Sequence, residues 1–521
     1  VTPPVITVSW DLNDPVNGKY YKDTRTATVT VTERNFNPDD VKYNITNTLN
    51  NNVTFGEWTS DGNINVSDSA KSTCEIQFGC DGDYTFQPEC TDLAGNFTKH
   101  ETKYEFTIDK TDPEITLAYS NEKTPEGTTA TEHNDIYYDG NRTATITFSD
   151  LNLSKNESAF IIQLEDLKVK KTYNLDKEDS IKELESLQDM KGEKVFSKVE
   201  IGDIIDGEKV NENVNVNKKK FIVTLTFNGE EHYSNIGFSC KDLAGRGNSE
   251  LKYSGDTSDQ TNTEFVIDKT PPELEVTYGI NTYDINTNTE KFEELKGPVT
   301  NRKYTKNPVK YNIKVTERNF PDFPGEKNNY ISSKTKVEDG DENPYTPDTE
   351  IQDSENWNSS QNVIKYEWTY GCTLESEGNY TQDFAITDLA GHKVECEGSQ
   401  FTIDKTSPTG DIKVDSSPIS ELLNRITFGG FTRFFNRSVA VEFTGEDVIS
   451  PVDIFQYKSY REQQDANLVK DNSGWKNIPG SKVGSGSKSL NGSYIQNPDQ
   501  QFVTYSKIVD RAGNTAYYGS V

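Results

Sequence analysis

Short segments of alternating apolar and polar side chains recur along the whole chain. In residues 26–32, Ala27, Val29 and Val31 share one face and the intervening threonines share the other. A period of two places neighbouring side chains on opposite faces of a strand, so each such segment predicts a half-buried β-strand. Later segments repeat this register at Ala144, Ile146 and Phe148, at Tyr311, Ile313 and Val315, and at Val439, Val441 and Phe443.

One short phrase, Asp-x-Ala-Gly, occurs four times. Its aspartate is suited to cap nearby backbone amides, and its glycine supplies the positive φ that closes a hairpin with a bulge. An aromatic residue stands eight or nine positions before each aspartate, as in the tyrosine corner of Ig-like sandwiches, although the antibody spacing differs. The phrases begin at Asp92, Asp242, Asp388 and Asp510, and the aromatic residues are Tyr84, Tyr233, Tyr380 and Phe502.

A second phrase, a strand ending in Ile-Asp-Lys-Thr and then proline, follows the first three turns. Its aspartates are Asp109, Asp268 and Asp404. Proline fixes φ and has no amide to pair, so it suits a short, stiff crossing between folding units. Because each internal repeat forms one such unit, we expect an all-β chain of four sandwiches arranged as an elongated rod. Their predicted bounds are residues 1–109, 110–268, 269–404 and 405–521.

Two of the repeats are longer than the others. The second carries an insertion at about 154–220, in which residues 177–190 space Ile181, Leu184 and Leu187 as a helix would. The third carries a polar insertion at about 325–362. Insertions in repeats map to loops, which sometimes bind ligands.

Composition narrows the classes of partner. The 521 residues include 85 acidic and 54 basic side chains, a net charge of −31, which disfavours nucleic acid and anionic membranes. No run of 18 apolar residues predicts a membrane span. The chain opens Val1-Thr-Pro-Pro, and the same Thr-Pro-Pro follows Asp-Lys at Thr270, so we expect a fragment cut from a longer array.

The repeated phrases resemble the tandem Ig-like domains of large surface proteins in Gram-positive gut bacteria. The Asp-Leu-Ala-Gly turn and the Ile-Asp-Lys-Thr-x-Pro ending carry this resemblance through residue 404, and the fourth repeat is similar to a related subtype. The resemblance implies tandem immunoglobulin-like β-sandwiches, a bacterial cell-surface or secreted location, and a role as spacer or adhesive module. One fold carries many functions, so the resemblance is weak evidence for any particular one.

The repeated aspartates raise the question of calcium. Asp92 with Asp109, or Asp388 with Asp404, would supply oxygen ligands if each pair met at one domain end. The alternative is that the first aspartate caps its turn and the second ends its strand. We favour that alternative because no dense D-x-D-x-D run accompanies them. No metal or cofactor is therefore predicted, and calcium is kept as the second hypothesis.

The six cysteines show no zinc-binding spacing. Cys90 and Cys240 stand two residues before a turn aspartate, where the third repeat has Ile386, so this position is predicted to be a buried apolar slot. Cys74 shares the inward register of its strand, and a bridge from Cys74 to Cys90 competes with a core-thiol interpretation.

Residues suited to catalysis are sparse. His100, His133, His232 and His392 are scattered over three repeats, and no nucleophile, zinc-protease or phosphate-loop motif occurs. An enzyme is not expected, and no catalytic residue is predicted. A Lys–Asn crosslink would need a lysine on a first strand, and only Lys413 stands in such a place.

Aromatic residues suggest a sugar-binding surface as an alternative to core packing. The two patches considered are Phe428, Phe431, Phe434 and Phe435, and the pair Trp357 and Trp368. Residues this close in sequence are more often core or domain junction. Trp58, Trp357 and Trp475 recur at similar places and are predicted to be structural.

Three functions follow from these observations. The first is a non-enzymatic, monomeric stalk and adhesin-type scaffold at the cell surface. In the second, the repeats themselves bind a host ligand such as a glycan, a mucin or an immunoglobulin through the insertions at 154–220 and 325–362. The third is an accessory region of a secreted glycan-degrading enzyme.

Overall fold

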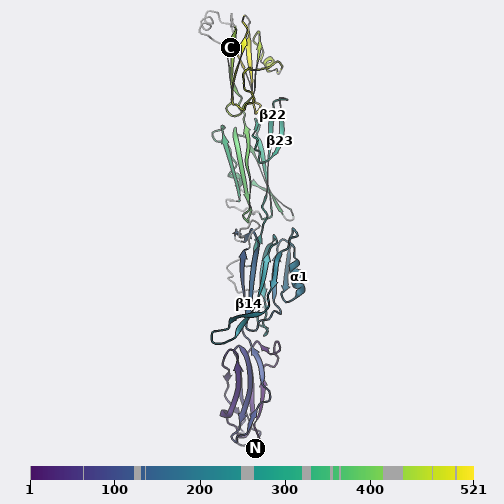
Figure 1. The fold of residues 1–521 in the computed structure, drawn as a ribbon, viewed down its shortest axis with the longest axis vertical. Helices are drawn as coiled ribbons and strands as arrows, with labels where there is room; N and C mark the ends of the chain where they lie inside the picture. The colour runs from purple at the N-terminus through teal and green to yellow at the C-terminus, as the bar shows by residue number, and fades with distance from the viewer. Residues whose placement is uncertain are drawn as a thin grey trace. The chain divides into compact units, whose positions relative to one another are not determined.

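The computed structural model describes residues 2–62, 64–121, 131–134, 136–247, 263–319, 330–352, 356–362, 365–414, 438–471, 473–498 and 502–520. Its regular secondary structure is almost entirely β, which confirms the all-β part of the predicted fold, and the described strands form eight sheets (Figure 1). The chain folds into two compact units, Val1–Lys269 and Thr270–Val521, called below the N-terminal unit and the C-terminal unit.

The first two sheets of the N-terminal unit enclose one hydrophobic core. Strand β3 (Arg25–Thr32) buries every second side chain, which confirms the predicted alternation. Ile76 from one sheet and Phe106 from the other meet in this core. One sheet has the order β1 (Val5–Trp10), β3, β7 (Lys71–Phe78), β5 (Thr54–Phe55), with β6 (Thr59–Ser60) also on β7. The other has the order β2 (Tyr20–Tyr21), β10 (Tyr104–Ile108), β8 (Gly82–Thr91), β4 (Val41–Asn47), with β9 (Phe97–Lys99) on β8 and the short helix η1 (Pro38–Asp40) before β4.

The second pair of sheets repeats this plan with extra elements. Strand β14 (Arg142–Asp150) again buries alternate residues, among them Ile146 and Phe148. One sheet has the order β11 (Glu114–Asn121), β14, β19 (Asn217–Phe227), β17 (Phe196–Ile201), with β18 (Ile205–Lys209) on β19. The other has the order β12 (Glu132–His133), β13 (Tyr137–Tyr138), β21 (Phe265–Ile267), β20 (His232–Ser239), β15 (Ala159–Leu164), β16 (Val169–Asn174).

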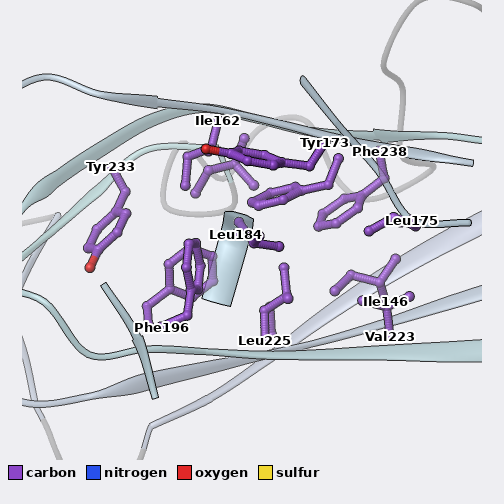
Figure 2. Packing of buried hydrophobic residues seen from close by; sticks show 14 of the residues in the cluster. Ile146, Ile162, Tyr173, Leu175, Leu184, Phe196, Val223, Leu225, Tyr233 and Phe238 are labelled. Carbon is purple, nitrogen blue, oxygen red and sulfur yellow. The ribbon is translucent and has the colours of Figure 1, made fainter. Parts of the chain in front are cut away.

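The predicted helix in the second insertion is confirmed as α1 (Glu178–Ser186). It contacts β16 and β17 and buries Leu184 completely. Figure 2 shows Leu184 among the rings of Phe196, Tyr173 and Phe238, inside the core of the second pair of sheets. The helix therefore packs against the core through Leu184, while most of its other residues are exposed.

The C-terminal unit contains the remaining four sheets. In its first pair, one sheet has the order β23 (Thr289–Lys296), β22 (Glu273–Asp284), β25 (Val309–Glu317), β28 (Lys365–Leu374), β27 (Asn358–Asn362), and the other β24 (Lys303–Thr305), β30 (Lys393–Ile403), β29 (Gly378–Thr387), β26 (Ile331–Glu338), with the short helix η3 (Glu350–Gln352) after β26. In its second pair, one sheet has the order β31 (Thr409–Val414), β32 (Val439–Glu446), β35 (Ser489–Gln496), and the other β34 (Lys476–Asn477), β33 (Val452–Tyr460), β36 (Val503–Asp510), β37 (Thr515–Gly519), with the helix α3 (Ala466–Lys470) after β33. The four hydrophobic clusters each lie within one pair of sheets. The boundaries of independent folding stay a prediction.

In three of the four repeats, the aromatic residue upstream of the turn is a tyrosine fixed at or next to the start of a late strand, whereas Phe502 of the fourth repeat is half-buried and precedes β36. Each tyrosine is buried and donates its hydroxyl hydrogen to the backbone carbonyl four residues earlier. The bonds join Tyr84 to Cys80 at 2.8 Å, Tyr233 to Gly229 at 2.7 Å and Tyr380 to Ser376 at 2.7 Å.

Among the described residues, no helix is long and apolar enough to cross a membrane.

Candidate cation sites at the ends of the sheet pairs

The aspartate of each Asp-x-Ala-Gly phrase caps its own turn, as predicted. Asp92 Oδ1 accepts hydrogen bonds from the amides of Ala94 and Asn96 at 2.9 and 2.8 Å. The amide four residues after the aspartate makes the same bond in the other copies, at 2.8 Å to Asp242, 2.8 Å to Asp388 and 2.9 Å to Asp510. Glycine is required here because Gly95, Gly245, Gly391 and Gly513 have φ between +75° and +92°.

The second oxygen of the turn aspartate distinguishes the copies. Asn96 Nδ2 donates to Asp92 Oδ2 at 2.7 Å, and Asn514 Nδ2 donates to Asp510 Oδ2 at 2.9 Å. His392 Nδ1 lies 2.9 Å from Asp388 Oδ2. The side chain at the fourth position thus supplies a partner in three copies. Sequence reasoning missed the role of His392 as the partner of a buried carboxylate.

The second copy lacks this partner. Its fourth residue is Arg246, whose Nε lies 3.1 Å from Oδ1 of Asp112 without a well-directed hydrogen bond. Asp242 is only 5% exposed, and its Oδ2 is buried without a hydrogen-bond partner. An unpaired buried acceptor is costly, about 1–3 kcal/mol and more when it is charged.

The aspartates that end the last strands join the turns of the following repeat, not those of their own. Oxygens of Asp109, Asp150 and Asp242 all lie within 4.8 Å of one another, and so do oxygens of Asp404, Asp447 and Asp510. We call these the N-terminal and C-terminal carboxylate clusters. All six residues are at most 6% exposed.

The pairs considered as calcium ligands in the second hypothesis, Asp92 with Asp109 and Asp388 with Asp404, do not meet in the structure. Strand β10 runs antiparallel to β8 and places Ile108 opposite Gly82, so Asp109 lies at the start of β8, whereas Asp92 follows its other end. Strand β30 places Ile403 opposite Gly378 in the same way, at the start of β29. The two phrases of one repeat therefore lie at opposite ends of a ten-residue strand.

Sequence reasoning missed the third member of each cluster. Asp150 and Asp447 continue the inward register of their strands, two residues beyond Phe148 and four beyond Phe443. Glu33 and Glu317 continue the same register in the other two repeats and are also buried. An acidic residue at an apolar position of the alternation was the available signal.

Burial raises the pKa of five clustered carboxyls, those of Asp109, Asp150, Asp242, Asp404 and Asp510. Burial and the neighbouring Asp109 raise the pKa of Asp150 to about 8, and burial raises the pKa of Asp242 to about 7. Burial raises the pKa of Asp109, and the 2.6 Å hydrogen bond that Asn152 Nδ2 donates to Asp109 Oδ2 opposes this rise. In the other cluster, burial and Asp404 raise the pKa of Asp510 to about 8. Carboxylates this close and this buried need protons, donors or a cation.

The C-terminal carboxylate cluster has its donors. Ser450 Oγ donates to Asp404 Oδ2, and Asn514 Nδ2 donates to both the Asp404 carbonyl and Asp510 Oδ2, at 2.7 and 2.9 Å. The amides of Ile449 and Ser450 donate to Asp447 Oδ1, each at 2.8 Å.

The other sites considered from sequence fall elsewhere. All six cysteines are free, so the Cys74–Cys90 bridge is wrong, and both side chains lie in a core, as does Cys240. Trp357 and Trp368 are each only 7% exposed, so they form no sugar-stacking surface. The patch Phe428, Phe431, Phe434 and Phe435 lies outside the described residues.

The recurring tryptophans and Lys413 have structural surroundings. Trp58 packs on Phe36 at 4.8 Å between ring centroids, and Trp475 lies 5.8 Å from Tyr517, which fits the predicted structural role. Lys413 is 72% exposed and 3.9 Å from Asp411, so it does not point into a core where a crosslink would be shielded.

The second insertion contributes to an open groove in the N-terminal unit. Its volume is about 580 Å³, and Ile204 and Ile205 on its wall are 39% and 52% exposed. The groove also includes Tyr20, Leu151, Asn152, Leu153, Asp206, Lys219 and Leu243.

Comparison with known proteins assigns no family. Neither a family model nor a curated protein matches the chain. One of the solved structures that match it is that of dimeric latent PorU from Porphyromonas gingivalis, with 9% sequence identity and a TM-score of 0.17. The match covers 81% of this chain and 35% of that one, so the chain spans about a third of its length. A likeness this weak carries no argument about fold or function.

Proposed function

We propose that this chain is a non-enzymatic segment of an extracellular bacterial surface protein, in which four Ig-like β-sandwiches act in series as a stalk. This proposal is supported by hydrogen bonds that hold the linker between successive pairs of sheets inside each compact unit. Asn152 donates to Asp109, and Asn514 donates to the Asp404 carbonyl, so a turn or strand end of the following sheets is tied to the residue where the preceding strand ends. Linkers held in this way resist bending, which a stalk requires.

Small-angle scattering of the full chain tests this proposal. Four sandwiches in line, with strands of eight to ten residues rising about 3.3 Å each, predict a maximum dimension on the order of 100 Å or more. A compact particle, or the broad distribution of distances of freely jointed domains, would contradict the stalk.

A second function has a specific observation in its favour. The groove beside Ile204 and Ile205 presents exposed apolar side chains from the insertion at 154–220, and exposed apolar surface often marks an interaction site. On this alternative the insertion binds a host glycan, a mucin or an immunoglobulin. The full chain would be tested on glycan arrays and against mucin and immunoglobulin.

The matched variants separate the two functions. The double variant I204S/I205S should abolish binding if the groove is the site, whereas Ile285→Ser, which changes an isoleucine 38% exposed in the C-terminal unit, should not. Absence of binding by the unmodified chain would leave the stalk as the function, and equal binding by both variants would exclude this groove.

A further inference from the structure

We propose that the N-terminal carboxylate cluster, Asp109, Asp150 and Asp242, binds one hard divalent cation, and that this cation is Ca²⁺. Calcium binding at this cluster does not depend on the proposed stalk function. It rests on the clustered oxygens together with a separate observation, the buried oxygen of Asp242 that has no donor.

The missing donor points to a ligand. In the other three copies the residue four positions after the turn aspartate partners its Oδ2, through Asn96, His392 or Asn514. Arg246 stands at this position in the second copy and pairs with Asp112 instead. Asp242 Oδ2 is therefore left buried and unpartnered, in a carboxylate that belongs to the cluster.

The two cationic side chains near the cluster each pair with a carboxylate outside it. Lys218 and Arg246 act on its carboxyls, but Lys218 pairs with Glu114 at 3.5 Å and Arg246 with Asp112 at 3.1 Å. Asp81 adds a further negative charge near Asp109. When all three carboxyls are ionised, they and these neighbours carry an excess of negative charge, which a bound cation would neutralise.

The geometry and the ligand type select calcium. Two oxygens bound to one Ca²⁺ at 2.3–2.6 Å lie at most about 5 Å apart, and the cluster oxygens lie within 4.8 Å of one another. The three ligands are all carboxylate oxygens, which suit calcium, whereas zinc sites in proteins are built mainly from nitrogen and sulfur ligands. Calcium takes six to eight oxygens, and water and backbone carbonyls would complete its shell.

Calorimetric titration of the metal-stripped full chain with CaCl₂ tests the site. Asp150→Asn and Asp242→Asn should each remove one equivalent of bound calcium or weaken its Kd at least tenfold. Both changes keep the size of the side chain. The control is Asp14→Asn, which removes the same charge from an exposed loop position of the same unit and should leave binding unchanged.

Amide hydrogen exchange shows whether the variants fold and where the ion acts. Calcium should slow exchange at residues 109–112 and 242–246 of the unmodified chain by at least tenfold and should have no such effect in Asp242→Asn. Exchange in β14 and β20 serves as the folding control. Lack of calcium uptake at millimolar concentration, retention of the equivalent in both variants, or tighter binding of ZnCl₂ in parallel titrations would each overturn the proposal.

Discussion

The two carboxylate clusters have the same origin and differ in how their charge is balanced. Each combines the aspartate that ends a last strand, the acidic residue at the inward end of the alternating strand, and a turn aspartate. In the C-terminal cluster, Ser450 and Asn514 donate hydrogen bonds to the carboxylates. In the N-terminal cluster the residue equivalent to Asn514 is Arg246, and Asp242 Oδ2 has no donor.

This difference shows that the repeated turn keeps one constant hydrogen bond to its aspartate, while the partner of the second carboxylate oxygen varies from copy to copy. The capping bond from the backbone amide to Oδ1 is present in all four copies, because it closes the turn whatever side chain follows. The bond to Oδ2 depends on one side chain. A single position therefore decides whether the buried carboxylates are balanced by the protein itself or by a ligand.

Among the substitutions, the largest expected effect comes from breaking the cluster that is already balanced. Asn514→Ala would leave the Asp404 carbonyl and Asp510 Oδ2 without their donor, and two unpaired buried acceptors predict a loss of about 3 kcal/mol. Hydrogen exchange in β36 and β37 would measure it. Asn96→Ala is the matched control at a half-buried turn, where about 1 kcal/mol or less is expected because water can replace the amide. Equal losses in the two variants would contradict the importance of burial.

Calcium should produce the next largest effect, confined to the N-terminal cluster. At a free concentration one hundred times Kd, a ligand that binds only the folded state stabilises it by about 2.7 kcal/mol. The thermal transition of the unmodified chain should rise between chelator and calcium, and that of Asp242→Asn should rise much less. An equal rise in both would place the calcium elsewhere.

In the absence of calcium, pH should also change the stability of the N-terminal unit. The pKa of Asp150 is about 8 and that of Asp242 about 7 in the folded chain, above the unfolded value of about 3.9. Between these limits the folded state holds protons that the unfolded state has lost, so stability should fall as pH rises from about 4 to about 8 and then level off. Because protons and calcium compete, the calcium-induced rise in the thermal transition should grow over pH 5.5–8. Asp150→Asn should weaken both the fall of stability with pH and the growth of the calcium effect with pH. If the stability of the unmodified chain rose with pH over this range, these pKa shifts would be contradicted.

The sequence was sufficient to predict the local features, but it was not sufficient to predict which aspartates meet in the two carboxylate clusters. Alternation at Val29 and its neighbours predicted the strands, the spacing of Leu184 predicted α1, and Gly95 predicted its turn, because each rests on local backbone preferences. The meeting of Asp109 with Asp242 could not be predicted, since it requires knowing which end of β8 the last strand reaches.

Burial was the second limit. The sequence alone does not show whether Trp357 and Trp368 lie on the surface, because their burial depends on the strands packed beside them. Cys74 and Cys90 are both buried, as their inward register indicates, but they are free thiols. Only the register of Asp150 and Asp447 was available and went unused. An acidic residue that continues an apolar register has to be balanced by something, and that inference needs no structure.

The smallest expected effect would sharpen the comparison most directly. Arg246→Asn places at the second turn the amide that partners Asp92 and Asp510 in their own copies. It should raise the calcium-free stability of the N-terminal unit by about 1 kcal/mol, because the gain of a donor for Asp242 Oδ2 outweighs the loss of a half-exposed ion pair with Asp112. Arg34→Asn, which removes an exposed arginine paired with Asp68 at 3.7 Å, controls for the change in net charge and should leave stability within about 0.5 kcal/mol. A loss of stability on Arg246→Asn, measured in chelator by thermal unfolding, would identify the guanidinium as the balancing cation of the cluster and would remove the reason for placing calcium there.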